Sequence, residues 1–596
     1  YASTQPDYSS FLVAGRPKTG QSLEQVRDLL LAEVAKLRDG DFDENLIEAT
    51  INNYKMQLMR SFEENDSRAI LYVYSFISGT DWADEVARID RMSKITKQDI
   101  VDWANKYLGP ESYAIVYKRE GKDPNEQKIA APKITPIVTN RDSQSEFLTE
   151  IQNSKVEPIE PVFVDYKKDM SQFEAQKGVN VLYKKNETND IFTLIYVFNT
   201  GTENDPALNL AFDYLSYLGT DKMSAEQIAS EMYAIACSFG LSAGANQSWI
   251  EVSGLSENMG KAMEIVEGLI AGAQPNEEIL QNLKGDMIKS RADAKLNQSR
   301  CFGALQRYMI YGSDFRRTTL TDPALQGLTS EQLLAKIGDL MGKQHEVLYY
   351  GPQDEAEVKA ALAAHHKVAA DLQPLEKKFS TLQPTDENKV MLAQYDAKQL
   401  YYMQYSNRGE KFDLAADPQI TLYNEYFGGG MNTIVFQEMR EARGLAYSAW
   451  ANLAIPTNAK GDYYYMAFIA TQNDKMQKAI EAFDEIINNM PESEKAFSIA
   501  KEALISRLRT ERTVKDGVLW SYIRMRDLGL TEPRGKQIFE KAQQMTLADV
   551  KAAQEKWVKG RKYVYGILGD IQDLDLNYLK TLGPIQTVTQ EEIFGY

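Results

Sequence analysis

The sequence predicts an α+β protein that is built from repeated modules, each with a layer of strands and a layer of helices. Three local patterns recur in the same order, and they join helix-like stretches to strand-like ones. The chain has 596 residues, which is too many for one hydrophobic core. We therefore expect three or more domains of about 100–200 residues each, and internal repeats are the first guide to their limits.

The first pattern is a threonine, then an apolar-periodic helix, then a strand. It occurs at Thr96, Thr329 and Thr546, which are separated by 233 and 217 residues. A threonine oxygen at a helix start accepts a hydrogen bond from one of the backbone N–H groups left free there. Each threonine is therefore expected to cap the helix that follows it.

The second pattern is a long helix, a polar break and a helix rich in aromatic residues, and the third is a strand, a turn and an amphipathic helix. The second pattern starts at residues 43, 276 and 493, and the third at residues 7, 248 and 462. In the first copy of the third pattern, Ser22 and Gln25 have the spacing of a capping box. Apolar residues then follow at helical intervals, namely Leu23, Val26, Leu30 and Leu37.

Two copies have an opening part, two strands and a helix, that the first copy lacks. This part starts near Gly178 in one copy and near Val390 in the other. Residues 7–8 correspond to residues 462–463, which lie about 70 residues into the last copy. We therefore expect residue 1 to fall inside a module that a preceding segment completes.

Composition excludes several classes of protein. The chain has 67 basic and 85 acidic residues, a net charge of −18, which disfavours nucleic acid and anionic membranes as partners. It has no apolar run of about 20 residues, so no membrane-spanning helix is expected. The two cysteines, Cys237 and Cys301, are too few for a disulfide framework or a cysteine-based zinc cluster.

The stretch GGGMNTIVFQEMREARGLAYS, which starts at Gly428, is the sharpest local motif. A helix should follow the glycines and end near Gly444, before a strand. Arg440 and Tyr447 would then flank the turn and could point into one cleft. There they could hold a peptide carbonyl and donate to a developing oxyanion. From the residues alone, however, an Arg at a helix end and a Tyr at a strand start are usually structural.

This stretch resembles the C-terminal signature of the insulinase/pitrilysin-type zinc metallopeptidases, also called inverzincins. The resemblance implies four homologous modules in two halves that close like a clamshell, each with a mostly antiparallel sheet packed against helices. The first module of the family carries an H-x-x-E-H zinc motif. The last supplies an Arg and a Tyr with the spacing of Arg440 and Tyr447. By this resemblance, Arg440 binds substrate and Tyr447 is catalytic.

The family's module order assigns each part of the chain. Residues 1–118 are expected to be the C-terminal part of a truncated second module, and residues 119–177 an interdomain linker rich in Pro and charge. Residues 178–368 would be the third module and residues 369–596 the fourth. The chain would be the C-terminal portion of a longer protein and would lack the zinc-binding module.

The histidines do not fit the zinc motif, which needs two His one helical turn apart with a Glu between them. His345 is expected to start a strand. His365 and His366 are adjacent and so should lie on different faces of a helix. At the equivalent place in the third module, before Gly219, the five motif positions are held by Leu210, Ala211, Phe212, Asp213 and Tyr214. We expect zinc in the intact protein and no metal ligands in this chain.

These expectations combine into a zinc metalloendopeptidase that cleaves peptides in a closed chamber. Its partners would be peptide substrates and either a missing N-terminal half or a separate zinc-bearing subunit, and this chain alone would be inactive. The alternative is a non-catalytic partner subunit or a peptide-binding scaffold of the same fold. Bacterial relatives are often exported, which is compatible with a periplasmic location, but the sequence does not establish a compartment.

Overall fold

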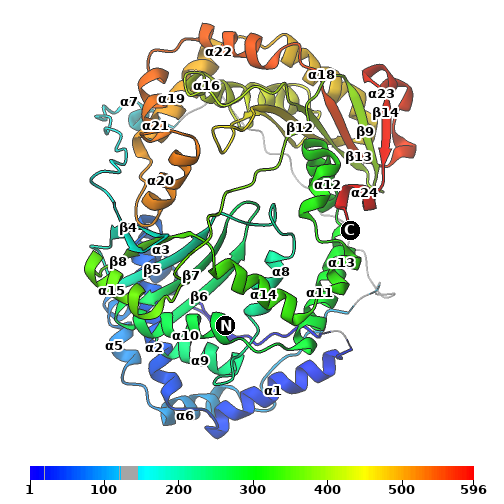
Figure 1. The fold of residues 1–596 in the computed structure, drawn as a ribbon. Coiled ribbons are helices and arrows are strands. Elements are labelled where there is room, and N and C mark those ends of the chain that lie inside the picture. Colours follow the sequence, from blue (N-terminus) through cyan, green and yellow to red (C-terminus); the bar gives the residue numbers. More distant parts are fainter. Residues whose placement is uncertain (19, 120, 122–144) are drawn as a thin grey trace. The chain divides into compact units, whose positions relative to one another are not determined.

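The computed structural model describes residues 1–18, 20–119, 121 and 145–596. By its internal contacts the chain divides into two compact units, Tyr1–Glu160 and Pro161–Tyr596. Figure 1 shows the elements of both units. Each unit is described by itself below. No helix among the described residues is long and apolar enough to cross a membrane.

The first unit is mainly helical. Ser22 caps its first helix, and the Gln25 side chain caps in return, as predicted. Thr96 and Asp99 form a second capping box, at the start of helix α6 (Lys97–Tyr107). The strand expected at residues 113–118 is absent, because no neighbouring strand among the described residues pairs with it. The elements are β1 (Ala2–Thr4), β2 (Ser9–Phe11), α1 (Leu23–Asp39), α2 (Asn45–Phe62), α3 (Asn65–Ser78), α4 (Trp82–Val86), α5 (Arg88–Met92), α6 (Lys97–Tyr107) and α7 (Glu146–Asn153).

The third module has a six-stranded sheet of order β3-β4-β8-β5-β7-β6. Only the β4–β8 pair is parallel. Its strands are β3 (Ser171–Gln176), β4 (Val179–Lys185), β5 (Ile191–Phe198), β6 (Cys237–Ala243), β7 (Ser248–Leu255) and β8 (His345–Gly351). Its helices are α8 (Leu208–Leu215), α9 (Ala225–Ala234), α10 (Met259–Gly272), α11 (Glu277–Lys295), α12 (Gln298–Tyr311), α13 (Asp322–Gly327), α14 (Ser330–Met341) and α15 (Glu355–His365).

Strand β3 lies at the end of the predicted linker of residues 119–177, of which residues 120 and 122–144 lie outside the described part of the chain. This strand lies inside that range, yet it pairs with β4, with Ser171 opposite Tyr183. Its residues alternate between more and less exposed positions, as an edge strand requires, but the stretch lacks the apolar content of the inner strands. The module's sheet therefore starts before residue 178.

The fourth module repeats the architecture with a sheet of order β11-β12-β10-β13-β9-β14. The pairs of β9 with β13 and β14 are parallel and the others antiparallel, so both sheets are mostly antiparallel, as predicted. Its strands are β9 (Lys389–Gln394), β10 (Gln399–Ser406), β11 (Ser448–Ala454), β12 (Tyr464–Gln472), β13 (Val564–Gly569) and β14 (Ile585–Val588). Its helices are α16 (Asp417–Phe427), α17 (Ile434–Phe436), α18 (Met476–Asn488), α19 (Glu494–Thr510), α20 (Gly517–Asp527), α21 (Arg534–Ala542), α22 (Leu547–Ala553), α23 (Leu576–Leu582) and α24 (Gln590–Phe594).

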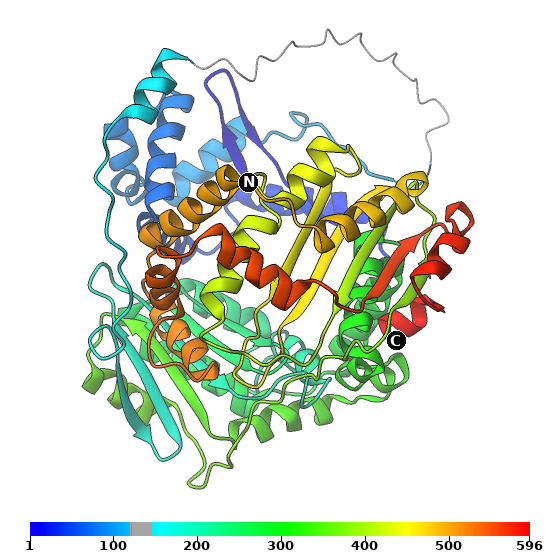
Figure 2. The ribbon, with the colours of Figure 1, turned by 90° about the horizontal axis from the view of Figure 1, so that it is seen from above.

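Each module lends one helix to the other module's sheet. Leu305 and Met309 of α12 pack in one hydrophobic cluster with Met403 of β10. Leu519 of α20 packs in another cluster with Ile195 of β5. Most other helices of the fourth module lie across the opposite face of its sheet, as Figure 2 shows in yellow to orange-red. The two modules therefore complete each other's cores.

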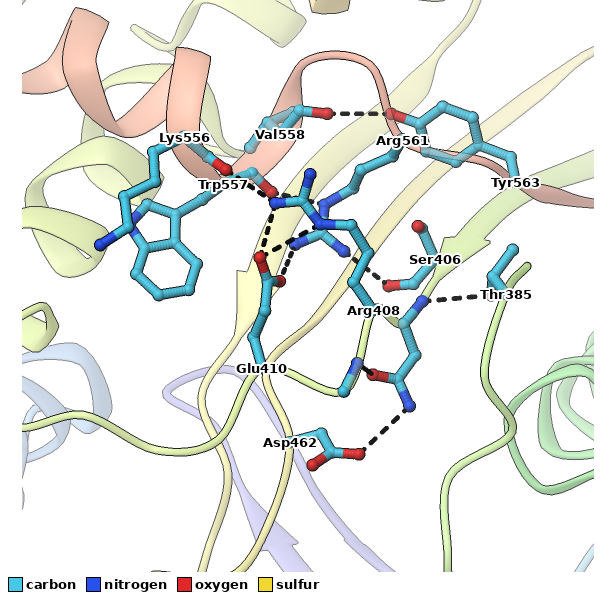
Figure 3. Close-up of polar contacts among 12 residues, drawn as sticks. Thr385, Ser406, Arg408, Glu410, Asp462, Lys556, Trp557, Val558, Arg561 and Tyr563 are labelled. Atoms are coloured by element: carbon cyan, nitrogen blue, oxygen red, sulfur yellow. Dashed lines mark hydrogen bonds and ion pairs between the residues drawn. The ribbon is translucent and has the colours of Figure 1, made fainter. Parts of the chain in front are cut away.

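A buried polar cluster links the end of β10 to the start of β13 (Figure 3). The Arg561 guanidinium donates to the backbone carbonyls of Trp557 and Ser406 and to the Glu410 carboxylate. Arg408 donates to the same carboxylate at 2.6 Å. Burial lowers the pKa of Arg561, and the charge of Glu410 opposes that shift. Such charge-assisted bonds to several acceptors hold the loop after β10 against the segment that precedes β13.

The helix caps give a first testable prediction. Thr329 accepts from the Gln332 N–H, and the Gln332 side chain accepts from the Thr329 N–H at 3.0 Å. Thr329→Ala removes the first bond and should destabilise the third module by about 1 kcal/mol, whereas Thr329→Ser keeps it. Urea unfolding followed by circular dichroism measures the difference. Equal midpoints for the alanine and serine variants would contradict the capping role.

Candidate active-site residues in the fourth module

Two of the three glycines in the loop after α16, Gly428 and Gly429, stand where side chains would not fit. A Cβ on Gly428 would lie 2.2 Å from the Asn424 carbonyl oxygen, and one on Gly429 would lie 2.8 Å from the Cβ of Trp450. The close approach lets the Ala451 N–H donate to the Gly428 carbonyl. The glycines thus hold the loop against strand β11.

The helix predicted after this loop is present, but it changes type. It starts as α17 and continues as a π-helix over Gln437–Ala442, a widened turn that is often found at functional sites. Gly444 ends it with a φ of +57°, as the sequence predicted. The Thr471 hydroxyl donates to the Leu445 carbonyl at 2.6 Å. This bond fixes the turn between Arg440 and Tyr447.

The structure brings Arg440 and Tyr447 together. The Arg440 guanidinium carbon lies 4.6 Å from the centre of the Tyr447 ring and 4.9 Å from the centre of the Phe436 ring. The cation is therefore held between two aromatic rings, an arrangement that is worth about 0.5–1 kcal/mol at exposed sites. Its Nε lies 3.5 Å from the Glu441 carboxylate. Arg440 and Tyr447, which flank the turn in the sequence, are therefore in contact in the structure.

The Tyr447 side chain is available to a ligand. The residue is 80% exposed, and its hydroxyl forms no hydrogen bond within the described part of the chain. A guanidinium offers several N–H donors to a carbonyl oxygen, and a phenol beside it can donate to an oxygen that gains negative charge. The pair therefore offers hydrogen-bond donors to a ligand at this surface.

Phe436 is a contact that the sequence argument missed. It precedes Arg440 by four residues, a spacing that places two side chains on one helix face and could have indicated the contact. We expect a double-mutant cycle of Phe436→Leu and Arg440→Met, read by urea unfolding, to give a coupling of about 0.5–1 kcal/mol. In the control cycle, Ile499→Ala on α19 takes the place of Phe436→Leu, and its effect should add to that of Arg440→Met. Additive effects of the first pair would mean that the stacking contributes nothing.

The histidines form a different arrangement from a zinc site. His345 Nε2 faces His366 Nε2 at 2.8 Å, and His366 Nδ1 lies 2.6 Å from the Glu267 carboxylate. His366 is fully buried, and both of its ring nitrogens already have partners, one in His345 and one in Glu267. Among the described residues, no group of three His, Cys, Asp or Glu side chains could hold a metal ion. The donor set therefore does not fit zinc.

The five positions that correspond to the zinc motif lie on α8, as the sequence placed them. Leu210, Ala211, Phe212 and Tyr214 are buried in the third module's core. Asp213 is exposed, although the surrounding protein raises the pKa of its carboxyl by desolvation. This helix packs as a structural element.

Comparison with known proteins finds a family model that matches the part of the chain containing these features. Residues 342–504, which include both Arg440 and Tyr447, match the model of the peptidase M16 inactive domain. This part of the chain is therefore similar to the M16, insulinase-type, peptidases. An uncharacterized zinc protease of Rickettsia bellii is 24% identical over 309 residues, which cover 50% of this chain and 70% of that protein.

Several solved structures share the fold. The M16 inactive domain from Pseudomonas fluorescens has a TM-score of 0.54 at 18% identity, over 67% of this chain and 98% of that one. The periplasmic protease PqqL from Escherichia coli has a TM-score of 0.54 at 14% identity, over 92% of this chain and 63% of PqqL. A mutant of the ferredoxin protease FusC, solved with Arabidopsis ferredoxin, scores 0.55 at 11% identity, over 92% and 61%. At these identities the likeness concerns the M16 fold.

Proposed function

We propose that this M16 chain supplies the substrate-contacting wall of a zinc peptidase whose metal is held by another module or chain. The observation that carries the proposal is the Arg440 guanidinium stacked between two rings beside an exposed, unbonded Tyr447 hydroxyl. Arg440 would hold a substrate carbonyl. Tyr447 would donate to the oxyanion that forms when the peptide bond is attacked.

The zinc-bearing partner would dock on helix α3 of the first unit. Its side chains Tyr72, Tyr74 and Phe76 are exposed, Phe76 by 88%. The corresponding aromatic-rich helices of the later modules, α12 and α20, bury such residues against a neighbouring module's sheet. Tyr72 and Phe76 lie four residues apart on one helix face, and such exposed aromatic residues at the same place in the repeat support a sheet of the same kind as the partner.

The match to an inactive-domain model also supports a second candidate function. In this alternative, the chain is a non-catalytic subunit or scaffold that holds peptides for another protein. The absence of a metal-ligating group among the described residues is compatible with both functions. A periplasmic location, as in the name of PqqL, would suit either one.

One experiment separates the two functions. The native assembly is isolated through an affinity tag on this chain, and its zinc content and its hydrolysis of quenched fluorescent peptides are measured beside those of the chain alone. We expect bound zinc and chelator-sensitive hydrolysis in the assembly and neither in the chain. An assembly that binds peptides without zinc and without hydrolysis would instead establish the scaffold.

A further inference from the structure

A recess lies where strands β5 and β7 of the third module meet helix α20 of the fourth. Alternate residues of a strand share one face, so Trp249 and Glu251 of β7 point to the same side of the sheet. Glu251 lies opposite Ile195 in the neighbouring strand β5. The sheet therefore supplies an aromatic ring, a carboxylate and an apolar side chain in one patch.

Helix α20 closes the patch from above. Asp516, Trp520, Arg524 and Asp527 follow one another at intervals of four, four and three residues, so they lie on one helix face. Together with the sheet residues they line a cavity of about 490 Å³. A volume of this size falls within the range of small-ligand sites.

Two tryptophans form its aromatic walls. The rings of Trp249 and Trp520 are 6.5 Å apart between centroids and inclined by 72°. The face of an indole carries partial negative charge and attracts cations more strongly than other aromatic side chains do. Neither tryptophan is fully buried, which leaves part of each ring open to a ligand.

The charged groups of the recess favour a cation. The Glu251 carboxylate forms no ion pair or hydrogen bond with the described residues. Burial raises the pKa of Asp516, while the charge of Lys515 and a hydrogen bond with the Trp520 side chain oppose that shift. Asp527 is neutralised by Lys377, whose Nζ lies 2.6 Å away. Arg524 is the one cation among the lining residues and lies exposed.

We propose that this recess binds the side chain of a lysine or arginine of a peptide. The ammonium or guanidinium group would lie against the open parts of the Trp249 and Trp520 rings with Glu251 as its counter-ion, and the aliphatic stem would contact Ile195. Such long side chains bury their stems and keep the charge near polar groups. The proposal concerns binding alone and does not depend on the chain's part in hydrolysis.

The test uses the complete chain and three capped pentapeptides that differ only at the central residue, which is lysine, norleucine or glutamate. Isothermal titration at low salt should give the highest affinity for the lysine peptide. Glu251→Gln should weaken that binding about three- to tenfold and leave the norleucine peptide unchanged. Asp286→Asn, at an exposed carboxylate of α11, is the matched control and should change nothing.

For a second variant we expect the affinity for the lysine peptide to change in the opposite direction. Arg524→Ala removes the competing cation, so it should tighten binding of the lysine peptide by about two- to fivefold. A gain in affinity cannot come from a damaged fold. Equal binding of the norleucine peptide, stronger binding of the glutamate peptide, or no binding of any peptide at millimolar concentration would overturn the proposal.

Discussion

In the zinc-containing assembly, Tyr447→Phe should lower the turnover of peptide substrates by about 10²–10³-fold. The change removes only the hydroxyl, which makes no hydrogen bond within the described residues, and it keeps the ring that lies 4.6 Å from Arg440. An oxyanion donor acts mainly in the transition state, so kcat should fall while KM changes little. Steady-state kinetics with a quenched fluorescent peptide measures both constants.

Two controls make this result specific. Tyr217→Phe changes another exposed tyrosine, in the third module, and should leave turnover as it is. Zinc content should be the same in both variants, because neither residue belongs to a metal-ligating group. Unchanged turnover in Tyr447→Phe would remove the catalytic role and leave Tyr447 as a partner in the Arg440 stack.

The buried histidine pair should make the third module sensitive to acid. The His345 Nδ1 N–H donates to the Lys343 carbonyl, so its Nε2 accepts the proton that His366 Nε2 donates. Protonation of His345 would place a second proton between two nitrogens that are 2.8 Å apart. Burial, and then the nearby His366, lower the pKa of His345 to about 4.

The direction in which stability changes with pH follows from the pKa of His345 in the unfolded chain and its pKa in the folded chain. Unfolded His345 titrates near 6.5, so between about pH 6.5 and 4 the unfolded chain binds the extra proton. The contribution of neutral His345 to stability is therefore complete above pH 6.5 and is lost as the pH falls through 4. A shift from 6.5 to about 4 corresponds to about 3 kcal/mol.

His345→Gln tests this prediction, because an amide can still accept from His366 but does not titrate. Hydrogen–deuterium exchange of β8 amides should show wild-type protection falling between pH 6.5 and 4, and a much flatter profile in the variant. His365→Gln, at the last residue of α15, is the matched control and should keep the wild-type slope. A variant whose slope equals that of the wild type would assign the acid sensitivity to other groups.

Features encoded by neighbouring residues could be predicted from the sequence. The threonine and serine caps, the repeated helix pairs and the glycine end of the Arg440 helix all depend on contacts within a few residues. The proximity of Arg440 and Tyr447 was also predicted, since both flank one turn. The π-helical geometry of that turn was not, because it depends on how the segment packs between the sheet and α18.

Features that depend on contacts between residues far apart in the sequence could not be predicted in this way. Strand β3 was assigned to a linker because only its pairing with β4 makes it a strand, and residues 113–118 were assigned to a strand that has no pairing partner in the described chain. His345 and His366 looked unrelated in sequence, yet the crossing of β8 and the end of α15 brings their rings together.

The sequence by itself determined the repeats, the helix caps and the spacing of Arg440 and Tyr447, because short-range backbone geometry and side-chain periodicity fix them. The tertiary structure alone decided that α12 and α20 are exchanged between two sheets and that α20 forms the tryptophan recess with β7. The physical reason is that an apolar helix face can be buried equally well against any apolar sheet face. Only the folded chain shows which sheet covers it.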